Sequence, residues 1–227
     1  MEIGNDFLQA AIEHSGKPLR TGGNTFYMRD GKLCIQASRR PASSGKNWVQ
    51  TPARERCNRH FAAMRAVATY LKGVYEGLPV WQLAKKRQGW RMTVENFLMR
   101  VMRPYFDERG EMVRCEGALM SVGDLVPPMG LAGEYAEGKL SLRWEAGEDA
   151  PGASRTDRLE VVYVRESRRG HVGRAQLEGA VRGDGEAAFA LELAPGDRLH
   201  VFPFFAAADL SDFSRNGYLC VEGPAVP

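Results

Sequence analysis

The sequence lacks the patterns by which several large protein classes are recognised. It contains no run of about eighteen apolar residues, the length that a membrane-spanning helix needs. The most apolar stretch, residues 117–136, is interrupted by Asp124, Glu134 and two adjacent prolines. The first residues show no basic segment followed by an apolar one, and no glycine follows Met1, so neither export nor myristoylation is indicated. We therefore expect no membrane partner, and a location in the cytoplasm or in a larger assembled particle.

Cysteine is scarce and widely spaced. The four cysteines are Cys34, Cys57, Cys115 and Cys220. They form no C-x-x-C pair, and no histidine lies at the spacing of a zinc finger. This pattern favours free thiols over a disulfide framework and argues against a structural zinc site.

Catalytic and nucleotide-binding motifs are also missing. Gly45-Lys46 is not a phosphate-binding loop, because that motif needs a glycine where Arg40 stands and a hydroxyl residue where Asn47 stands. No serine occupies a G-x-S-x-G turn, and the histidines form no H-E-x-x-H motif. The histidines are His14, His60, His171 and His200. We predict a protein without a catalytic site, a metal or a cofactor.

What the sequence does contain is a strong division of charge. Residues 1–105 contain eighteen Lys/Arg and seven Asp/Glu, whereas residues 106–227 contain thirteen and twenty-one. The two parts carry formal charges of +11 and −8, although the whole chain carries only +3. Oppositely charged parts can attract each other, neighbouring copies or an outside polyanion.

The basic part begins with a predicted strand pair in residues 18–37. Residues 24–28 and 33–36 are β-prone runs on either side of Asp30-Gly31, a dipeptide that supplies the positive φ angles of a tight hairpin turn. The stretch that follows, residues 39–47, is polar and rich in structure-breaking residues. It is typical of a loop or an extended arm.

A long helix is predicted next. It begins at Pro52, whose missing N–H costs nothing at the first helical position, with Thr51 as its N-cap. Gly77-Leu78-Pro79 ends it. Its apolar residues recur at three- and four-residue steps and form one stripe of Phe61, Met64, Ala68, Leu71 and Tyr75.

A second helix follows a short basic segment at residues 81–91. Thr93 is the expected cap, and Pro104 ends the helix. The residues expected to face inward are Phe97, Leu98, Val101 and Met102.

Beyond Tyr105 the sequence changes to short runs separated by Gly, Pro and acidic residues. Period-two alternation in the clearest of these runs, with turn residues between them, favours an antiparallel β-sandwich. The six predicted strands are residues 139–144, 159–164, 175–181, 187–193, 199–204 and 218–222. The fold class is therefore α+β, with a basic hairpin-and-helix module over residues 1–111 and an acidic sandwich over residues 112–227.

Two resemblances accompany this interpretation. Residues 36–41, the start of the long helix at residues 51–61, and residues 196–201 resemble an uncharacterised family found in Bacteroidota, a domain of unknown function that implies no established activity. Residues 140–144 and 159–164 are similar to the second and third strands of fibronectin type III modules. That resemblance implies a fibronectin- or immunoglobulin-like sandwich with a tryptophan packed between its sheets.

Our leading hypothesis is a non-enzymatic structural, assembly or scaffold protein that contacts a protein partner or like copies. The charge division motivates it, because opposite patches on one chain permit head-to-tail contacts. An enzyme with a motif-free site where the two halves meet is a further alternative; it needs a pocket with convergent titratable groups.

The other alternative is a nucleic-acid-binding protein that uses the basic half. Cations beside indole rings suit a phosphate backbone with exposed bases, because the charge releases counterions while the ring stacks on a base. The interpretation without a binding function is that Trp81 and Trp90 pack into the core and the cations form its solvated face. The residues of this polyanion-binding alternative are Arg39, Arg40, Lys46, Trp48, Lys85, Lys86, Arg87, Trp90 and Arg91.

Overall fold

The protein divides into two compact units, Met1–Gln50 and Thr51–Pro227, which are described separately. The structure is a computed structural model. It describes residues 18–21, 24–29, 32–37, 51–147, 149–177 and 179–224.

In the first unit, three strands form an antiparallel sheet in the order β1-β2-β3. The strands are β1 (Leu19–Thr21), β2 (Asn24–Arg29) and β3 (Lys32–Ala37). The register pairs Arg29 with Lys32, at the end where the sequence predicts a turn. The predicted strand pair is confirmed, and β1 adds a third strand beside β2. The loop predicted at residues 39–47 lies outside the described residues.

The second unit begins with three helices. They are α2 (Pro52–Val74), α3 (Val80–Arg87) and α4 (Val94–Met102). Both predicted caps are present, because the side-chain oxygen of Thr51 accepts from the Arg54 amide at 3.3 Å and that of Thr93 accepts from the Asn96 amide at 3.2 Å. The short basic segment forms α3.

Phe61 is the exception to the apolar stripe predicted for α2. Met64, Leu71 and Tyr75 are buried as expected, but Phe61 is 59% exposed. Residues 51–59 are all exposed as well, so the first turns of α2 extend beyond the surface on which the rest of the helix packs. Helical periodicity identifies an apolar face but not how far along it a neighbour reaches.

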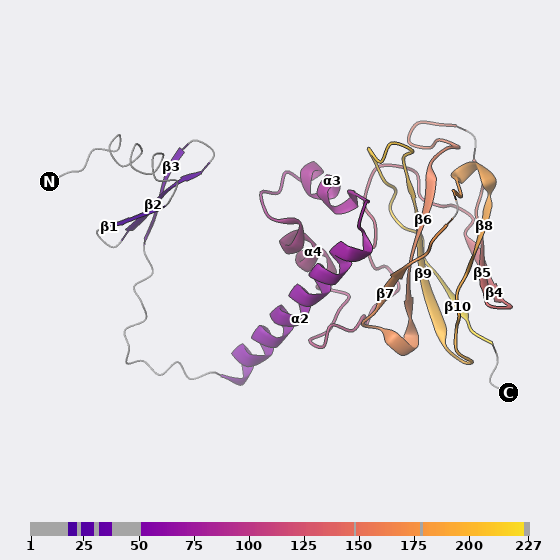
Figure 1. The fold of residues 1–227 in the computed structure, drawn as a ribbon, viewed down its shortest axis with the longest axis horizontal. Coiled ribbons are helices and arrows are strands. Elements are labelled where there is room, and N and C mark those ends of the chain that lie inside the picture. The colour runs from indigo at the N-terminus through magenta and orange to yellow at the C-terminus, as the bar shows by residue number, and fades with distance from the viewer. Residues whose placement is uncertain are drawn as a thin grey trace. The chain divides into compact units, whose positions relative to one another are not determined.

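Seven strands form two antiparallel sheets, β4-β5-β8 and β7-β6-β9-β10 (Figure 1). Their bounds are β4 (Ala132–Ala136), β5 (Lys139–Arg143), β6 (Arg158–Arg165), β7 (Val172–Arg174), β8 (Glu186–Ala190), β9 (Arg198–Ala206) and β10 (Leu219–Glu222). The first, second and fifth strands share one sheet, which is the fibronectin type III arrangement of a β-sandwich. Trp144, directly after β5, is buried with its ring 6.0 Å from that of Phe205. The predicted α+β fold class is confirmed.

Two details of the sandwich differ from the expectation. Strand β4 was not predicted, because four of its five residues are exposed and its sequence has no apolar alternation. Residues 175–181 are not a strand: β7 ends at Arg174, and Gly179 adopts a φ of 71°, which extended backbone does not allow. Only Val181 keeps a bridge, to Arg158 of β6.

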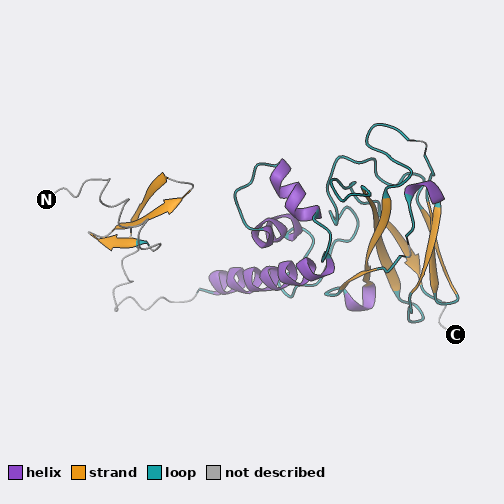
Figure 2. Cartoon of the chain, turned by 45° about the horizontal axis from the view of Figure 1, so that its top comes forward, coloured by secondary structure: helices purple, strands orange, loops and turns teal. Residues whose placement is uncertain are grey.

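The three helices pack against one face of the four-stranded sheet (Figure 2). One cluster of buried apolar side chains joins the helices to Val162 of β6 and to Phe202 and Phe204 of β9. A second cluster, which includes Val161 and Phe205, fills the space between the two sheets. Strands β6 and β9 are therefore buried on both faces.

This packing places the division of the chain elsewhere than the sequence suggested. We expected a boundary between residues 111 and 112, but the compact units meet at Gln50 and Thr51. The apolar stripes of α2 and α4 must be covered, and the face of the sheet that carries Phe202 and Phe204 covers them. The helices thus belong with the sandwich.

Candidate docking groove

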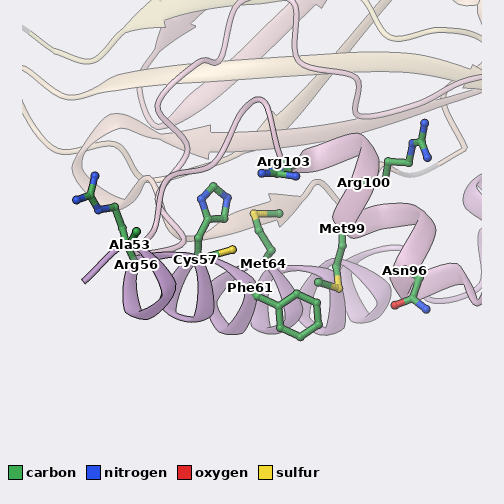
Figure 3. Close-up of a pocket in the computed structure, with 10 residues that line it drawn as sticks. Ala53, Arg56, Cys57, Phe61, Met64, Asn96, Met99, Arg100 and Arg103 are labelled. Atoms are coloured by element: carbon green, nitrogen blue, oxygen red, sulfur yellow. The ribbon is translucent and has the colours of Figure 1, made fainter. Parts of the chain in front are cut away.

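A hollow lies between the N-terminal half of α2 and one face of α4. Its volume is about 750 Å³. Figure 3 shows the side chains of both helices around it. It is lined by Ala53, Arg56, Cys57, His60, Phe61 and Met64 from α2 and by Asn96, Met99, Arg100 and Arg103 from α4 and its C-cap. We call this the α2–α4 groove.

The lining of the groove is largely apolar. Met64 is buried, Met99 is partly buried, and Phe61 and Cys57 are exposed. Figure 3 shows Met99 reaching from α4 towards α2, where Met64 lies. Methionine side chains are flexible and polarizable, so such a lining can adapt to an incoming apolar side chain. A contiguous exposed apolar surface is more often an interaction site than the rest of a protein's surface is.

The rim of the groove is cationic. Arg56 from α2 and Arg100 and Arg103 from α4 and its C-cap are among the lining residues. Figure 3 shows the guanidinium end of Arg100 pointing away from α2. None of the described residues that line the groove is acidic. Arg100 lies with its guanidinium carbon 4.0 Å from the centroid of the Trp90 ring, which orients that cation. The groove therefore suits a group that is both apolar and anionic.

His60, which lines the groove, has a buried Nε2 atom with no hydrogen-bond partner among the described residues. Trp81 Nε1 and Arg165 Nε, whose residues do not line the groove, are buried and unpartnered in the same way. An unsatisfied buried polar atom costs about 1–3 kcal/mol, and this cost is therefore not particular to the groove.

Five residues of the predicted polyanion-binding set are described, and Trp90 among them is not a free indole ring. Trp81 is fully buried, and the Trp90 ring packs edge-on against Phe97 at 5.8 Å. Lys85 donates to the Met92 carbonyl at 3.0 Å.

Arg87 lies 2.7 Å from the Asp212 carboxylate and 3.4 Å from Asp124. Lys86 and Arg91 are exposed. The remaining four residues of this set lie outside the described part of the chain: Arg39, Arg40, Lys46 and Trp48. Within this set, Lys85, Lys86 and Arg87 lie together because they are consecutive residues in the last turn of α3.

The sequence analysis missed the groove. Its lining residues on α4 recur at three- and four-residue steps, which is a signal for one helix face, but nothing in the sequence says that this face meets α2. The signal that could have found it is on α2, where Cys57, His60 and Phe61 stand between arginines ahead of the rest of the predicted apolar stripe.

A second arrangement of polar groups lies on the sandwich. His200 Nε2 is 2.7 Å from the Glu166 carboxylate, and His200 Nδ1 is 3.0 Å from the Tyr218 hydroxyl. A neutral imidazole that carries its proton on Nε2 satisfies both contacts, since the carboxylate accepts and the hydroxyl donates. Arg169 pairs with the same Glu166. No catalytic motif in the sequence marks His200.

This hydroxyl, imidazole and carboxylate series joins three segments of the sandwich. Burial raises the pKa of Tyr218 to about 12, so the phenol stays protonated. Burial, together with nearby Arg169 and Arg198, lowers the pKa of His200. The series ties the turn after β6 to β9 and to the segment before β10.

Within the residues that the structure describes, no group of three or more His, Cys, Asp or Glu side chains is placed to hold a metal ion. The described helices include none that has both the length and the apolar character to cross a bilayer.

Comparison with family models gives no match, and comparison with curated proteins gives none either. Among solved structures, the chain is similar to the FN1–FN3 domains of chicken CNTN1, with 9% identity and a TM-score of 0.35 over 46% of this chain and 34% of that one. It is also similar to the spore cortex lytic enzyme SleM of Clostridium perfringens, with 10% identity and a TM-score of 0.30 over 45% of this chain and 29% of that one. The match spans about a third of each of those chains.

Proposed function

We propose that this protein is a non-enzymatic assembly module that docks onto protein partners through the α2–α4 groove. The observation that supports the proposal is the combination of an adaptable apolar lining with three arginines and no acidic residue at its rim. The partner is a segment with a bulky apolar side chain flanked by carboxylates.

Two physical effects would act together in such a contact. Burial of an apolar side chain against Met64 and Met99 supplies most of the free energy, at about 25 cal/mol for each Å² removed from water. Carboxylates opposite Arg56 and Arg103 orient the partner and speed its association. The contact should therefore weaken as salt rises, because these guanidinium groups lie at the surface.

The test is binding of a fluorescent, short amphipathic helical peptide with glutamates on its polar face, followed by anisotropy. The same peptide with lysine in place of each glutamate should not bind. The double variant Arg56→Glu/Arg103→Glu should weaken binding at least about tenfold, whereas Arg143→Glu on the sandwich should leave it unchanged.

Two results would count against the docking proposal. Equal binding of the acidic and basic peptides would remove the charge selection on which it rests. Tight, salt-sensitive binding of single-stranded DNA that is lost when Lys85, Lys86 and Arg87 are neutralised would favour the nucleic-acid alternative instead.

A further inference from the structure

The acidic part of the same unit presents an occupant that fits the α2–α4 groove. Val126 and Met129 are 37% and 54% exposed, which makes them two of the large apolar side chains that the sandwich side of the molecule offers to solvent. Exposed carboxylates surround them on the same part of the chain, at Asp124, Glu145 and Asp149. We call residues 124–130 together with Glu145 the acidic knob.

The backbone of the acidic knob is fixed by hydrogen bonds. The Glu145 amide donates to the Met129 carbonyl at 2.9 Å, and the Val126 amide donates to the Gly152 carbonyl at 2.7 Å. The Val126 carbonyl accepts from the buried guanidinium of Arg182 at 2.8 Å. A surface that is held in place loses little conformational entropy on binding, so the knob is preorganised.

Gly130 keeps the carboxylate of the knob close to its apolar tip. The φ of Gly130 is 58°, and a side chain there would lie 2.8 Å from Glu145 Cγ. Glu145 therefore lies directly against the chain next to Met129. Any surface that receives the Met129 side chain also meets this carboxylate.

The charges of the two surfaces are complementary. The rim of the groove carries Arg56, Arg100 and Arg103. The knob carries Asp124, whose side chain is 79% exposed and lies 3.4 Å from Arg87, and the exposed Glu145. Arg87 is therefore a cation at the edge of the knob, and Arg155 is nearby, since its backbone amide donates to Asp149.

We infer that the α2–α4 groove of one copy receives the acidic knob of a second copy, with Met129 between Met64 and Met99 and with Glu145 opposite the groove arginines. This inference rests on the proposed docking function and names the partner as another molecule of the same chain. The two surfaces consist of different residues, so the contact is heterologous. Repetition of such a contact builds a ring or an open chain of copies.

The contact should be weak and reversible. A stable protein interface buries about 1,200–2,000 Å² of surface in total. The contact inferred here is one loop in one groove of about 750 Å³, and we expect it to bury a smaller area than that. Its charged groups lie at the surface and are screened by salt. Self-association should therefore increase with protein concentration and disappear at high ionic strength.

The experiment uses the full chain in sedimentation velocity across a concentration series at low and high salt. The wild-type protein should form dimers and larger species at low salt. Two variants test the surfaces separately: the groove variant Arg56→Glu/Arg103→Glu and the knob variant Met129→Lys/Glu145→Lys. Each alone should be monomeric, with self-association weakened at least about tenfold.

Mixing the two variants gives the sharpest result. The groove variant still carries an intact knob, and the knob variant still carries an intact groove, so an equal mixture should form one-to-one dimers and nothing larger. All four substituted residues are exposed or lie on the groove rim, so circular dichroism should show unchanged folding. A variant with Lys139→Glu and Glu192→Lys, in which the exposed Lys139 lies at the opposite end of the β4–β5 hairpin from the knob, should associate like the wild type.

Three results would overturn the inference. They are a wild-type chain that stays monomeric at low salt, oligomers that neither variant affects, and a variant mixture that stays monomeric. If the acidic peptide still binds the groove in any of these cases, the docking function stands and the partner is another protein. If the peptide also fails to bind, the proposed function fails with the inference.

Discussion

At the scale of single residues, the most consequential pair is Asp157 and Arg182. Both side chains are only 4% exposed, and their charged atoms lie 3.1 Å apart. The Arg182 guanidinium also stacks on the Phe205 ring at 3.9 Å and donates to the Val126 carbonyl. Asp157→Ala would leave this buried cation without its counter-ion. We expect a loss of about 3–5 kcal/mol in the free energy of unfolding, measured by urea denaturation.

The matched control is the exposed pair Arg198 and Glu222, whose atoms are 3.4 Å apart with side chains 57% and 76% exposed. Arg198→Ala should cost less than about 1 kcal/mol, because water screens both charges. Similar losses for the two substitutions would contradict the argument from burial.

The second prediction concerns His200 and pH. Its pKa is lowered in the folded protein, chiefly by burial and further by Arg169 and Arg198, so the unfolded chain takes up a proton at a higher pH than the folded one. The unfolded state therefore gains proton binding as pH falls below about 6.5, the ordinary pKa of histidine. The stability contributed by neutral His200 is present above that pH and is lost towards the lowered pKa.

The measurement is the urea midpoint at a series of pH values from about 7.5 to about 5.5. The wild-type midpoint should fall more steeply over this range than that of His200→Gln, which lacks the titrating group. Tyr218→Phe removes the hydroxyl beside Nδ1 and should reduce the difference without abolishing it. Parallel curves for the wild type and His200→Gln would show that His200 does not contribute.

Some of these residue roles could be predicted from sequence and others could not. The burial of Trp144 was expected from its place at the end of the alternating run 139–144 and from the resemblance to fibronectin type III modules. The contacts of His200 did not, since Glu166 and Tyr218 are 34 and 18 residues away from it and converge only when the sheet forms. Pairings over such separations leave no local pattern.

At the scale of elements, helix α2 has one part that packs in the core and another part that lines the groove. Leu71 is fully buried under the sheet, whereas Phe61, on the same predicted stripe, is 59% exposed. Leu71→Ala should cost about 2–5 kcal/mol, because it leaves a cavity in a packed core. Phe61→Ala should change the free energy of unfolding by less than about 0.5 kcal/mol but weaken binding of the acidic peptide. Urea denaturation and peptide anisotropy on both variants check this pair.

If Phe61→Ala destabilised the fold and Leu71→Ala did not, the assignment of Leu71 to the core and of Phe61 to the groove would be wrong. A large loss of stability from Phe61→Ala would mean that this ring is covered in the folded protein. Unchanged peptide binding with unchanged stability would mean that Phe61 takes no part in the groove.

Elements were predictable where a local sequence pattern indicates them. Thr51 with Pro52 and Thr93 gave the starts of α2 and α4, because a cap and its helix are neighbours in sequence. β4 was missed since an exposed edge strand needs no apolar alternation, and residues 175–181 were read as a strand although Gly179 breaks it. The groove between α2 and α4 depends on helix packing, which no single segment encodes.

At the scale of the whole molecule, the division of charge did not indicate the division of the fold. Eleven of the basic residues lie in residues 51–105, which pack with the acidic sandwich in one compact unit. The sequence of β9 contained a signal for this packing, because nearly all of its residues from Leu199 to Ala206 are apolar. In the structure all of them are buried. A strand with apolar residues on both faces is typical of a sheet covered on both sides. The helical layer could have been inferred from that run.

The last prediction follows from this shared core. A chain that begins at Thr51 keeps every residue of the second unit and should unfold in a single transition. A chain that begins at residue 112 loses all three helices and exposes Val162, Phe202 and Phe204, which the helices cover. Near-ultraviolet circular dichroism and binding of a hydrophobic dye distinguish the two.

The physical reason lies in the amount of apolar surface involved. Each of the two phenylalanines buries most of its ring only when the helices are present, and a fully buried Phe contributes about 1.5–3 kcal/mol. Their joint exposure consumes a large part of the 5–15 kcal/mol by which a domain of this kind is stable. The shorter chain should therefore bind the dye strongly and lose the fixed aromatic signal of Trp144. If it instead keeps that signal and unfolds cooperatively, the sandwich is a domain in its own right and the helices are an addition to it.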